Sequence, residues 1–429
     1  MYDRGMARAA LRRVAFLSQG KQMTGFKYRV LSRVLLAISF LYSVSWAIEA
    51  PLASPLPTSQ GVSAGASDFD YMIDDGLYAT VTSMNSFKKP DVKDERKIKL
   101  TNIDGFKKEI SVRAILQPDP APLAVIFLGL TSKSKDPLAR LWQAQLQEAG
   151  CHVLVFDSVF RSSFNECSGH GVCGNIQMEA WIAANVIRAF LDHPDVKGKV
   201  TKLGLIGASY GGILALNFAK LAKEGQLKIV PDRVLVFSPP VSMQCSATLL
   251  DKYYDEDRQR FGFLDLLKLK GAEPVPTGKA VPFSASLMRA GIGYVFREDL
   301  ADAITCSRDQ YQYKLPDPPK DDSKKSDEKS KHQFTRFIEQ VVYPYWNKQG
   351  RVKSLQDLWE FGDLYKLLQG CGDNVHAVLT ADDPLNDATL LKFIERDIPP
   401  SKVTVLPRGG HLGFIGCNWS RDKVMNLFK

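Results

Sequence analysis

The stretch IGASYGGILALNFAK, residues 206–220, places a serine between two different kinds of sequence. The apolar run at 202–207 before Ser209 is typical of a buried strand, and residues 212–224 repeat apolar side chains at helical spacing. The pattern therefore predicts a strand, a sharp turn at Ser209 and a helix. Glycines two residues before and after the serine leave room for a strained backbone at the turn, which is the setting of a nucleophilic serine.

A second G-x-S-x-G match, GVSAG at residues 61–65, competes with this one. It lies in a segment, residues 48–70, that is rich in Ala, Ser, Pro and Gly and is predicted to be flexible. The match follows no strand and opens no helix, so its serine, Ser63, has no rigid support. The alternative for the first match is a Gly-rich turn that only packs a helix closely on a strand. The strand and helix around Ser209 favour the catalytic interpretation.

Strands alternate with helices on both sides of Ser209. Two alternating polar and apolar segments, residues 97–105 and 109–118, come first and predict antiparallel strands. The continuous apolar run at 123–130 then predicts a buried parallel strand. Such alternation predicts βαβ units, and hence an α/β fold with a mostly parallel central sheet flanked by helices. Further strands are expected at 152–157, 202–207, 233–240, 374–384 and 402–407, and helices at 137–149, 176–193, 212–224 and 386–397.

The alternation stops between residues 243 and 370, which have a helical character and many aromatic side chains. One α/β core interrupted by a helical cap explains this better than two independent domains. The very polar segment at 316–331 is expected to be a disordered loop within the cap. The predicted organisation is a signal peptide, a flexible lead-in, the first part of the core, the cap and the second part of the core, at 1–47, 48–92, 93–242, 243–370 and 371–429.

The positive charge of the chain is concentrated at its N-terminus. The net charge is +9, and the first 33 residues hold eight Lys or Arg and one acid, which leaves about +2 on the rest. This distribution gives no reason to expect a nucleic-acid partner. An uncharged apolar run at 34–47 follows, ending in Ser45-Trp46-Ala47, and predicts a secretory signal peptide cleaved near Ala47. Translation could also start at Met23, and an uncleaved membrane anchor is the alternative interpretation.

Export to the periplasm or the medium would place the seven cysteines in an oxidising compartment. Cys167 and Cys173 flank a Gly-rich loop and form the easiest disulfide to close, and Cys245 with Cys306 is a weaker candidate. An odd count leaves at least one thiol unpaired. The chain has no C-x-x-C, and no spacing of Cys and His resembles a zinc site.

A nucleophilic serine needs a base. His411, in PRGGHLGF, directly follows a predicted strand, and the glycines before it let the chain turn there. His170, in CSGHGVCG, also follows the end of a predicted strand and is the alternative. The remaining histidines start a strand, lie within a strand, end a helix or border the polar loop. His411 is therefore the predicted base, with a surface-loop histidine as the ordinary alternative.

The base in turn needs a carboxylate that fixes its tautomer. Asp382 and Asp383 follow the strand that precedes the histidine strand, so either could orient His411 while the other caps the next turn. The order of the three residues along the chain is serine, aspartate, histidine.

With these three motifs in that order, the sequence resembles the α/β-hydrolase superfamily over about residues 95–429, and most closely its serine esterases and lipases. The resemblance implies a catalytic triad of Ser209, Asp383 and His411, with Asp383 chosen because it directly precedes the proline. It also implies an oxyanion hole formed by the backbone amides of Tyr210 and Leu130, with Thr131 as the alternative to Leu130. The chain departs from many members in having Leu128-Gly129-Leu130 where they have His-Gly.

The sequence thus predicts an exported serine hydrolase that cleaves a carboxylic ester through an acyl-enzyme, without metal or organic cofactor. Its substrate would be a small-molecule or lipid-like ester, and its membrane contact would be limited to an uncleaved signal segment. The side chains of Thr131 and Arg161 are candidates for an added contact near the oxyanion hole, although an arginine more often forms a surface ion pair. A thioesterase, peptidase or acyltransferase would use the same triad, and a non-catalytic binding protein or a membrane-anchored interaction protein are the alternatives from other classes.

Overall fold

The computed structural model contains one sheet of eight strands in the order β1-β2-β4-β3-β5-β6-β7-β8. β2 is antiparallel to both of its neighbours, and every pair from β4 to β8 is parallel. This confirms the predicted α/β fold with a mostly parallel sheet. The strands are β1 (Arg96–Leu100), β2 (Ile110–Ile115), β3 (Ala121–Phe127), β4 (His152–Val155), β5 (Val200–Ala208), β6 (Arg233–Phe237), β7 (Val375–Thr380) and β8 (Val403–Leu406).

The structure describes residues 69–85, 87, 90–165, 169, 171–275, 278–311, 313 and 332–429. All of them belong to one unit of the chain, Ser59–Lys429. The predicted signal peptide, the GVSAG motif and His170 lie outside the described residues. No helix in the described ranges is long and apolar enough to cross a membrane.

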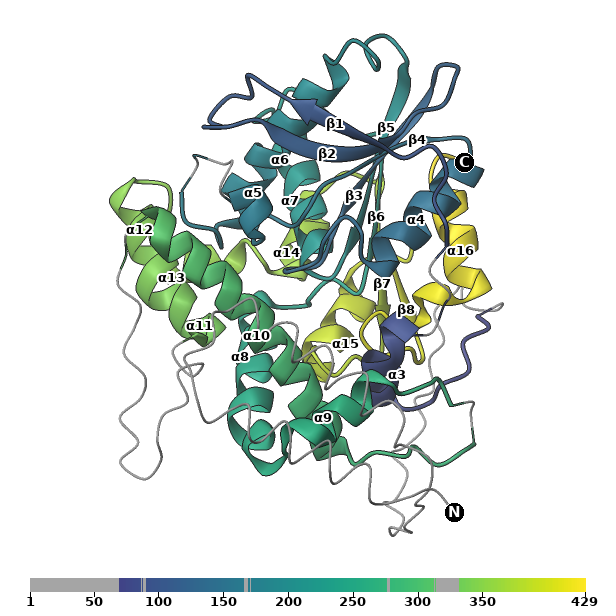
Figure 1. Ribbon diagram of the computed structural model, residues 1–429, viewed down its shortest axis with the longest axis vertical. Coiled ribbons are helices and arrows are strands. Elements are labelled where there is room, and N and C mark those ends of the chain that lie inside the picture. The colour runs from purple at the N-terminus through teal and green to yellow at the C-terminus, as the bar shows by residue number, and fades with distance from the viewer. Residues whose placement is uncertain are drawn as a thin grey trace, which may run out of the picture. The chain divides into compact units, whose positions relative to one another are not determined.

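Helices cover both faces of the sheet (Figure 1). α6 and α7 pack on one face and α4 and α16 on the other, so the alternating side chains of the central strands are buried in two separate apolar cores. α6 begins where the Asn175 side chain accepts a hydrogen bond from the Met178 amide, and α4 begins at a proline. The helices outside the insertion are α3 (Gly76–Thr82), α4 (Pro137–Glu148), α5 (Ser162–Asn165), α6 (Ile176–Leu191), α7 (Tyr210–Lys223), α15 (Ala388–Asp397) and α16 (Asn418–Met425), with 3₁₀ turns η1 (Ser83–Asn85) and η6 (Gly413–Gly416).

The described part of the insertion between β6 and β7 consists of helices joined by loops. Its helices gather away from β1 and β2 in Figure 1, and α14 returns to pack on α7. A fully buried Arg297 bonds Asp251 at 2.8 Å and lies over the Tyr254 ring, which ties the cap helices together. The elements are α8 (Met243–Lys252), η2 (Tyr253–Asp257), η3 (Arg258–Arg260), α9 (Phe263–Lys270), α10 (Ala285–Tyr311), α11 (Phe334–Phe337), η5 (Ile338–Val342), α12 (Tyr343–Lys348), α13 (Leu355–Glu360) and α14 (Leu364–Gly370). The polar segment 316–331 lies outside the described residues.

The structure corrects the interpretation of residues 48–92 as a flexible lead-in. Residues 76–82 of that range form α3, whose start is capped by the Asp75 side chain. Tyr78, Ala79 and Thr82 are all but fully buried. The prediction failed because a seven-residue helix shows only two turns of periodicity, and its stability comes from burial against the rest of the fold rather than from its own sequence.

The described cysteines of the two expected disulfides are not paired. Cys173 and Cys245 both carry free thiols, so the pairing of Cys245 with Cys306 is wrong. Cys167, the expected partner of Cys173, lies outside the described residues. Burial raises the pKa of the Cys173 thiol well above its usual range, which keeps this thiol in its unreactive protonated form.

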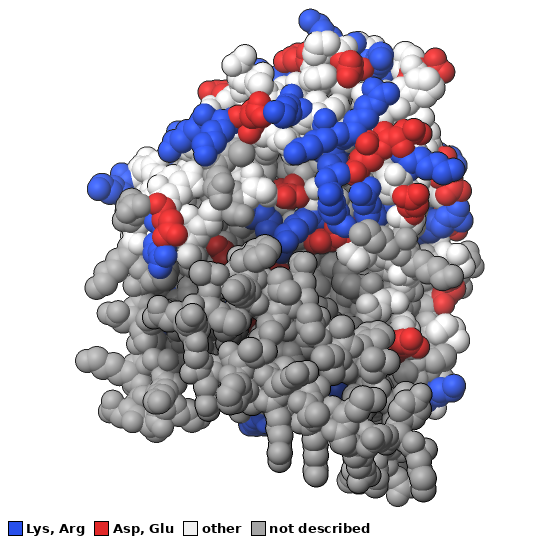
Figure 2. Space-filling view, in the orientation of Figure 1, with Lys and Arg blue, Asp and Glu red and all other residues white. Residues whose placement is uncertain are grey.

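Charges of both signs cover the described part of the face shown in Figure 2. Lys and Arg gather on its upper part, in the region of β1 and β2, with acidic side chains among them. Lys99, for example, pairs with Glu109 of the adjoining hairpin at 2.7 Å. Such mixing on this face agrees with the nearly neutral charge of the chain beyond residue 33.

Candidate active site

The carboxyl ends of the parallel strands meet at one edge of the sheet, and the predicted site residues leave from that edge. Phe127 of β3 lies beside Gly207 of β5, and Thr380 of β7 lies beside Leu406 of β8. Ser209 follows β5, Asp383 follows β7 and His411 follows β8. The register therefore brings together three residues that are far apart in the sequence. Ligand sites in open α/β sheets lie at this edge.

Ser209 is held in a strained backbone conformation between β5 and α7. Its φ is 53° and its ψ is −123°, values that a residue with a side chain rarely adopts. The Ser209 amide donates to the Phe237 carbonyl at 2.9 Å, which fixes the turn to β6. A Cβ on Gly207 would lie 2.5 Å from the Gly211 carbonyl oxygen, and one on Gly211 would collide with the carbonyls of Phe127 and Leu128. Both glycines are thus required by close backbone contacts.

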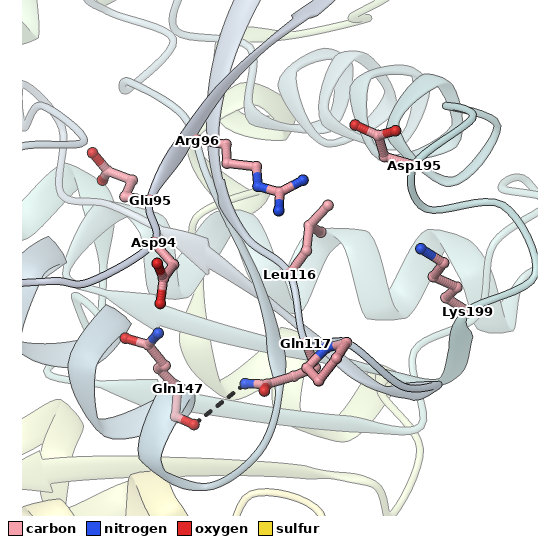
Figure 3. Close-up of a pocket in the computed structure, with 9 residues that line it drawn as sticks. Asp94, Glu95, Arg96, Leu116, Gln117, Gln147, Asp195 and Lys199 are labelled. Atoms are coloured by element: carbon pink, nitrogen blue, oxygen red, sulfur yellow. Dashed lines mark hydrogen bonds between the residues drawn. The ribbon is translucent and has the colours of Figure 1, made fainter.

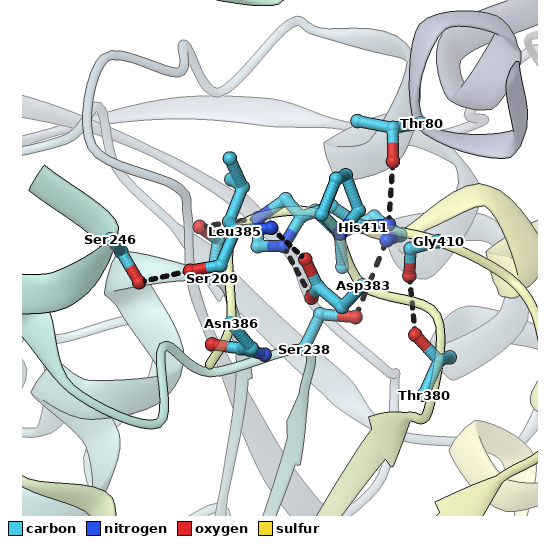
Figure 4. A network of polar contacts seen from close by, with 12 residues as sticks. Thr80, Ser209, Ser238, Ser246, Thr380, Asp383, Leu385, Asn386, Gly410 and His411 are labelled. Carbon is cyan, nitrogen blue, oxygen red and sulfur yellow. Dashed lines mark hydrogen bonds and ion pairs between the residues drawn. The ribbon is translucent and has the colours of Figure 1, made fainter. Parts of the chain in front are cut away.

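A continuous chain of hydrogen bonds joins the three predicted triad residues (Figure 4). His411 Nε2 lies 2.9 Å from Ser209 Oγ, and His411 Nδ1 lies 2.8 Å from Asp383 Oδ2. The other oxygen of Asp383 accepts from the Leu385 amide at 2.9 Å, and its side chain is fully buried. Ser209 itself is only half-buried, so its hydroxyl remains within reach of a substrate.

Two other described histidines are engaged elsewhere. His152 accepts from the Gln117 amide with Nδ1, and its Nε2 lies 3.1 Å from the Lys199 carbonyl. His376 is held by the Ser401 carbonyl and the Thr404 hydroxyl, both at 2.9 Å. Both rings therefore brace the sheet and its loops.

Two loops frame Ser209 where an oxyanion would lie. Tyr210 is the first residue of α7, so its amide is one of those that a helix leaves without an internal partner. On the other side, a Cβ on Gly129 would lie 3.9 Å from Ser209 Cβ, which places the loop after β3 against the serine. The Leu130 carbonyl in that loop accepts from the Ser158 hydroxyl, which holds the peptide between Leu130 and Thr131. The geometry is compatible with the expected hole formed by the Leu130 and Tyr210 amides.

The side chain of Tyr210 is itself anchored. It is buried, packs edge-on against Phe160 and donates its hydroxyl to Glu179 of α6. Glu179 also accepts from the Gly174 amide at 2.6 Å, and burial raises its pKa to about 7. Glu179 thereby fixes the residue next to the nucleophile.

The histidine loop is clamped by side chains from three different elements. Thr80 of α3 accepts from the His411 amide at 2.8 Å and donates to the Gly76 carbonyl at 2.7 Å. Thr380 donates to the Gly410 carbonyl at 2.8 Å, and the buried Ser238 accepts from the Leu412 amide. Figure 4 shows Thr80 and Thr380 reaching the loop around His411. α3 is therefore a structural part of the site.

Replacing Thr80 with alanine should lower kcat by about tenfold with a smaller change in KM. The variant leaves the amide of His411 without its acceptor, a loss of about 1–2 kcal/mol that falls on the position of the base rather than on substrate binding. Steady-state kinetics on an ester substrate measure the effect, and Thr80→Ser should restore the rate. Thr82→Ala is the matched control, because Thr82 makes the same kind of bond to its own helix at 2.8 Å. An equal loss of kcat in Thr82→Ala would show that α3 supports only the fold.

Asp382 also braces the loop that carries His411. Its carboxylate accepts from the amides of Gly409 and Gly410 at 3.1 and 2.8 Å. Burial raises the pKa of Asp382 to about 6, and the nearby charge of Asp383 adds to this, although the two amides act in the opposite direction. Asp382 thus holds the loop of the base, while Asp383 contacts the base itself.

The pKa of Asp382 predicts how stability changes with pH. The folded value, about 6, is above the unfolded value of 3.8, so the folded state binds more protons between these two values. The contribution of Asp382 to the free energy of unfolding should therefore fall as pH rises from about 4 to about 6, by roughly 2–3 kcal/mol in total. Urea unfolding of the wild type and Asp382→Asn at pH 4.5 and 7 measures it. The free energy of unfolding of the variant should rise relative to that of the wild type as pH rises. A difference between the two proteins that stays constant, or changes in the opposite direction, would contradict the raised pKa of Asp382.

Several residues that support the site, among them Thr80, Glu179 and Asp299, are not predicted from the sequence. Thr80 was missed because its segment was interpreted as flexible, although Asp75 and the helical spacing of Leu77, Tyr78 and Val81 were a usable signal. Glu179 lies in a helix that was predicted, but nothing local marks it as the partner of Tyr210. Asp299 of α10 contacts the loop after β3, and no sequence pattern connects the two.

The cavity drawn in Figure 3 is a separate feature. It has a volume of about 430 Å³ and is lined mainly by charged and polar side chains, among them Asp94, Arg96, Gln117 and Lys199. Lys199 directly precedes β5, whereas Ser209 follows it, so the cavity lies at the opposite edge of the sheet, roughly 30 Å away along the nine-residue strand. It takes no part in the hydrogen-bonded chain around Ser209. In the described ranges, no three His, Cys, Asp or Glu side chains are grouped as metal ligands would be.

No protein-family model and no curated protein sequence matches the chain. Among solved structures, it is similar to the Pyrococcus furiosus esterase Pf2001, at 12% identity over 80% of this chain and 92% of that one, with a TM-score of 0.46. The α/β hydrolase GrgF from Penicillium sp. sh18 is 13% identical over 77% and 95%, with a TM-score of 0.42. An esterase from Pyrobaculum calidifontis is 14% identical over 82% and 87%, with a TM-score of 0.39. Similarity at this level says nothing of the substrate. By the order of its strands and the strained turn that carries Ser209, the chain has the α/β-hydrolase fold.

Proposed function

We propose that the chain is a serine hydrolase that cleaves carboxylic esters through an acyl-enzyme. The observation that supports this most strongly is the unbroken chain from Asp383 through His411 to Ser209, with both contacts of the histidine below 3 Å. A histidine held in this way can take a proton from the serine and keep the resulting charge next to a buried carboxylate.

In the acylation step, Ser209 Oγ attacks the carbonyl carbon of the ester while His411 Nε2 takes the hydroxyl proton. The carbonyl oxygen becomes an oxyanion that accepts hydrogen bonds from the Leu130 and Tyr210 amides. The tetrahedral species collapses when the bond to the alcohol oxygen breaks, and His411 gives its proton to that oxygen. Asp383 stays ionised and stabilises the imidazolium between these two transfers.

Water completes the cycle. His411 Nε2 takes a proton from a water molecule, whose oxygen attacks the acyl carbon bound to Ser209. The second tetrahedral species releases the acid, and the proton returns from His411 to Ser209 Oγ. Because the helix dipole of α7 and the two amides are already in place, they lower the free energy of the oxyanion without reorganising in either step.

Pre-steady-state kinetics with 4-nitrophenyl acetate test this proposal. A burst of about one equivalent of nitrophenol per protein, followed by slower turnover, is expected if the acyl-enzyme accumulates. The acylated serine should be found on the peptide that contains residues 206–220. Turnover without any covalent species on a folded protein, or no turnover of any ester in a short- and long-chain series, would contradict it.

We further propose that the protein is exported and cleaved after Ala47. The basic segment, the apolar run at 34–47 and the small residues at the −3 and −1 positions support this. Intact-mass measurement of the protein purified from an expressing bacterial cell tests it. A mature chain that begins at Ile48 is expected, and a mass that retains residues 23–47 in the membrane fraction would favour the anchored alternative.

A further inference from the structure

One cap helix bridges the two loops that flank Ser209. Ile292, Phe296 and Asp299 of α10 lie at helical spacing on one side of the helix. Ile292 and Phe296 pack in the apolar cluster of Leu385, which follows the triad acid. One turn later, Asp299 Oδ2 accepts from the Thr131 hydroxyl at 3.1 Å, next to the predicted oxyanion amide of Leu130. α10 therefore contacts both loops that flank the nucleophile.

Asp299 is also the ion-pair partner of Arg161, and this pair is loose. Arg161 Nη2 lies 3.5 Å from Asp299 Oδ2, which is too long for a good hydrogen bond. The Arg161 side chain is only 15% exposed, whereas that of Asp299 is 38% exposed. The Nε of Arg161 is fully buried and has no hydrogen-bond partner among the described residues. A buried guanidinium with so few contacts is costly unless an anion satisfies it.

The backbone of Arg161 is hydrogen-bonded and lies close to the site. It directly follows Phe160, which packs on Tyr210, and its amide donates to the Ser158 carbonyl at 2.8 Å. Asp136 is a second acid near it. Burial raises the pKa of Asp136, the nearby Arg161 charge opposes this, and its carboxylate is already bound to the Lys133 amide at 2.7 Å. Asp299, which comes from the cap, is therefore the exchangeable partner.

We propose that Thr131 and Arg161 form a subsite for a carboxylate of the substrate, and that Asp299 of the cap occupies this subsite in the absence of substrate. This inference rests on the proposed ester hydrolysis and specifies the class of substrate. The substrate would be an ester whose acyl part also carries a free carboxylate. The forked guanidinium of Arg161 and the hydroxyl of Thr131 suit a planar carboxylate. The Asp299 carboxylate already lies against both groups. Because Thr131 adjoins Leu130, only a few methylene groups would separate the scissile carbonyl from the second carboxylate.

The test compares two esters of the same shape, the mono-4-nitrophenyl ester of glutaric acid and 4-nitrophenyl 5-methylhexanoate. The ratio of their kcat/KM values isolates recognition of the charge. Arg161→Gln should lower this ratio by about tenfold or more, with Arg161→Lys in between because it keeps the charge but loses the fork. Asp299→Asn should raise the ratio by a similar factor, since the internal competitor is neutralised. Asp302→Asn is the matched control, as it removes an exposed carboxylate from the same helix, and it should leave the ratio unchanged.

A second readout does not depend on turnover. Calorimetry should detect glutarate binding to Asp299→Asn more tightly than to the wild type, and the added Arg161→Gln change should abolish it. If glutarate binds in this way but no ester is cleaved, the subsite stands and the proposed function fails. If esters are cleaved but Arg161→Gln and Asp299→Asn leave the ratio and glutarate binding unchanged, the pair is only a structural contact of the cap and the subsite proposal is overturned.

Discussion

Replacing Ser209 with alanine should lower kcat on 4-nitrophenyl esters by about 10⁶-fold, the order of loss seen when a triad serine is removed. The variant has no atom that can form the acyl-enzyme, while the oxyanion amides and the binding surface remain. KM should therefore change much less than kcat. The thermal midpoint should not fall, because alanine adopts a positive φ no less readily than serine and, among the described residues, the hydroxyl bonds His411 alone.

The sequence itself supplies the matched control for this variant. Ser63 stands in the same G-x-S-x-G pattern, in GVSAG at 61–65. Ser63→Ala should leave kcat and KM at their wild-type values. Activity that survives in Ser209→Ala and is lost in Ser63→Ala would contradict the assignment of the nucleophile.

Asp383→Asn should lower kcat by about 10⁴-fold, because an amide at this position favours the wrong tautomer of the base and does not stabilise the imidazolium. Asp382→Asn should cost about tenfold or less. The side-chain oxygen of the asparagine can still accept a hydrogen bond from one of the two glycine amides. Asp383 Oδ2 remains 2.8 Å from His411 Nδ1. Steady-state kinetics on the two variants, side by side, measure the difference.

This pair of variants compares two adjacent residues with the same chemistry. Circular dichroism and urea unfolding at pH 7 check that both variants fold. If Asp382→Asn proved the more damaging of the two, the orienting acid would be Asp382, and the contacts around His411 would have to rearrange in the working enzyme.

Most of the sheet could be predicted because each strand carries its own signal. β3 and the buried part of β5, residues 203–208, are continuous runs of apolar residues and glycine, and β1 and β2 alternate as a half-buried hairpin does. The strand order follows from general rules of chain connection rather than from any one residue. α3 was missed because a short helix that depends on tertiary burial has little local signature.

The residues of the site also divide into those with a local sequence signal and those that depend on distant contacts. Ser209 and His411 could be predicted because each follows a strand with glycines beside it. The choice between Asp382 and Asp383 depends on which side chain points at the histidine. Adjacent residues in an extended segment point in opposite directions, so the sequence alone does not decide between them. Thr80, Glu179 and Asp299 act through contacts with partners 331, 31 and 168 residues away, which no local pattern records.

Labelling with a fluorophosphonate, followed by intact mass, tests the central claim most directly, because only an activated serine displaces fluoride at a useful rate. The wild type should gain the mass of one phosphonyl group per chain, on the peptide that contains Ser209. Ser209→Ala and His411→Ala should gain none under the same conditions while remaining folded. A folded wild type that stays unlabelled, or a label that persists in Ser209→Ala, would contradict the proposed serine hydrolase.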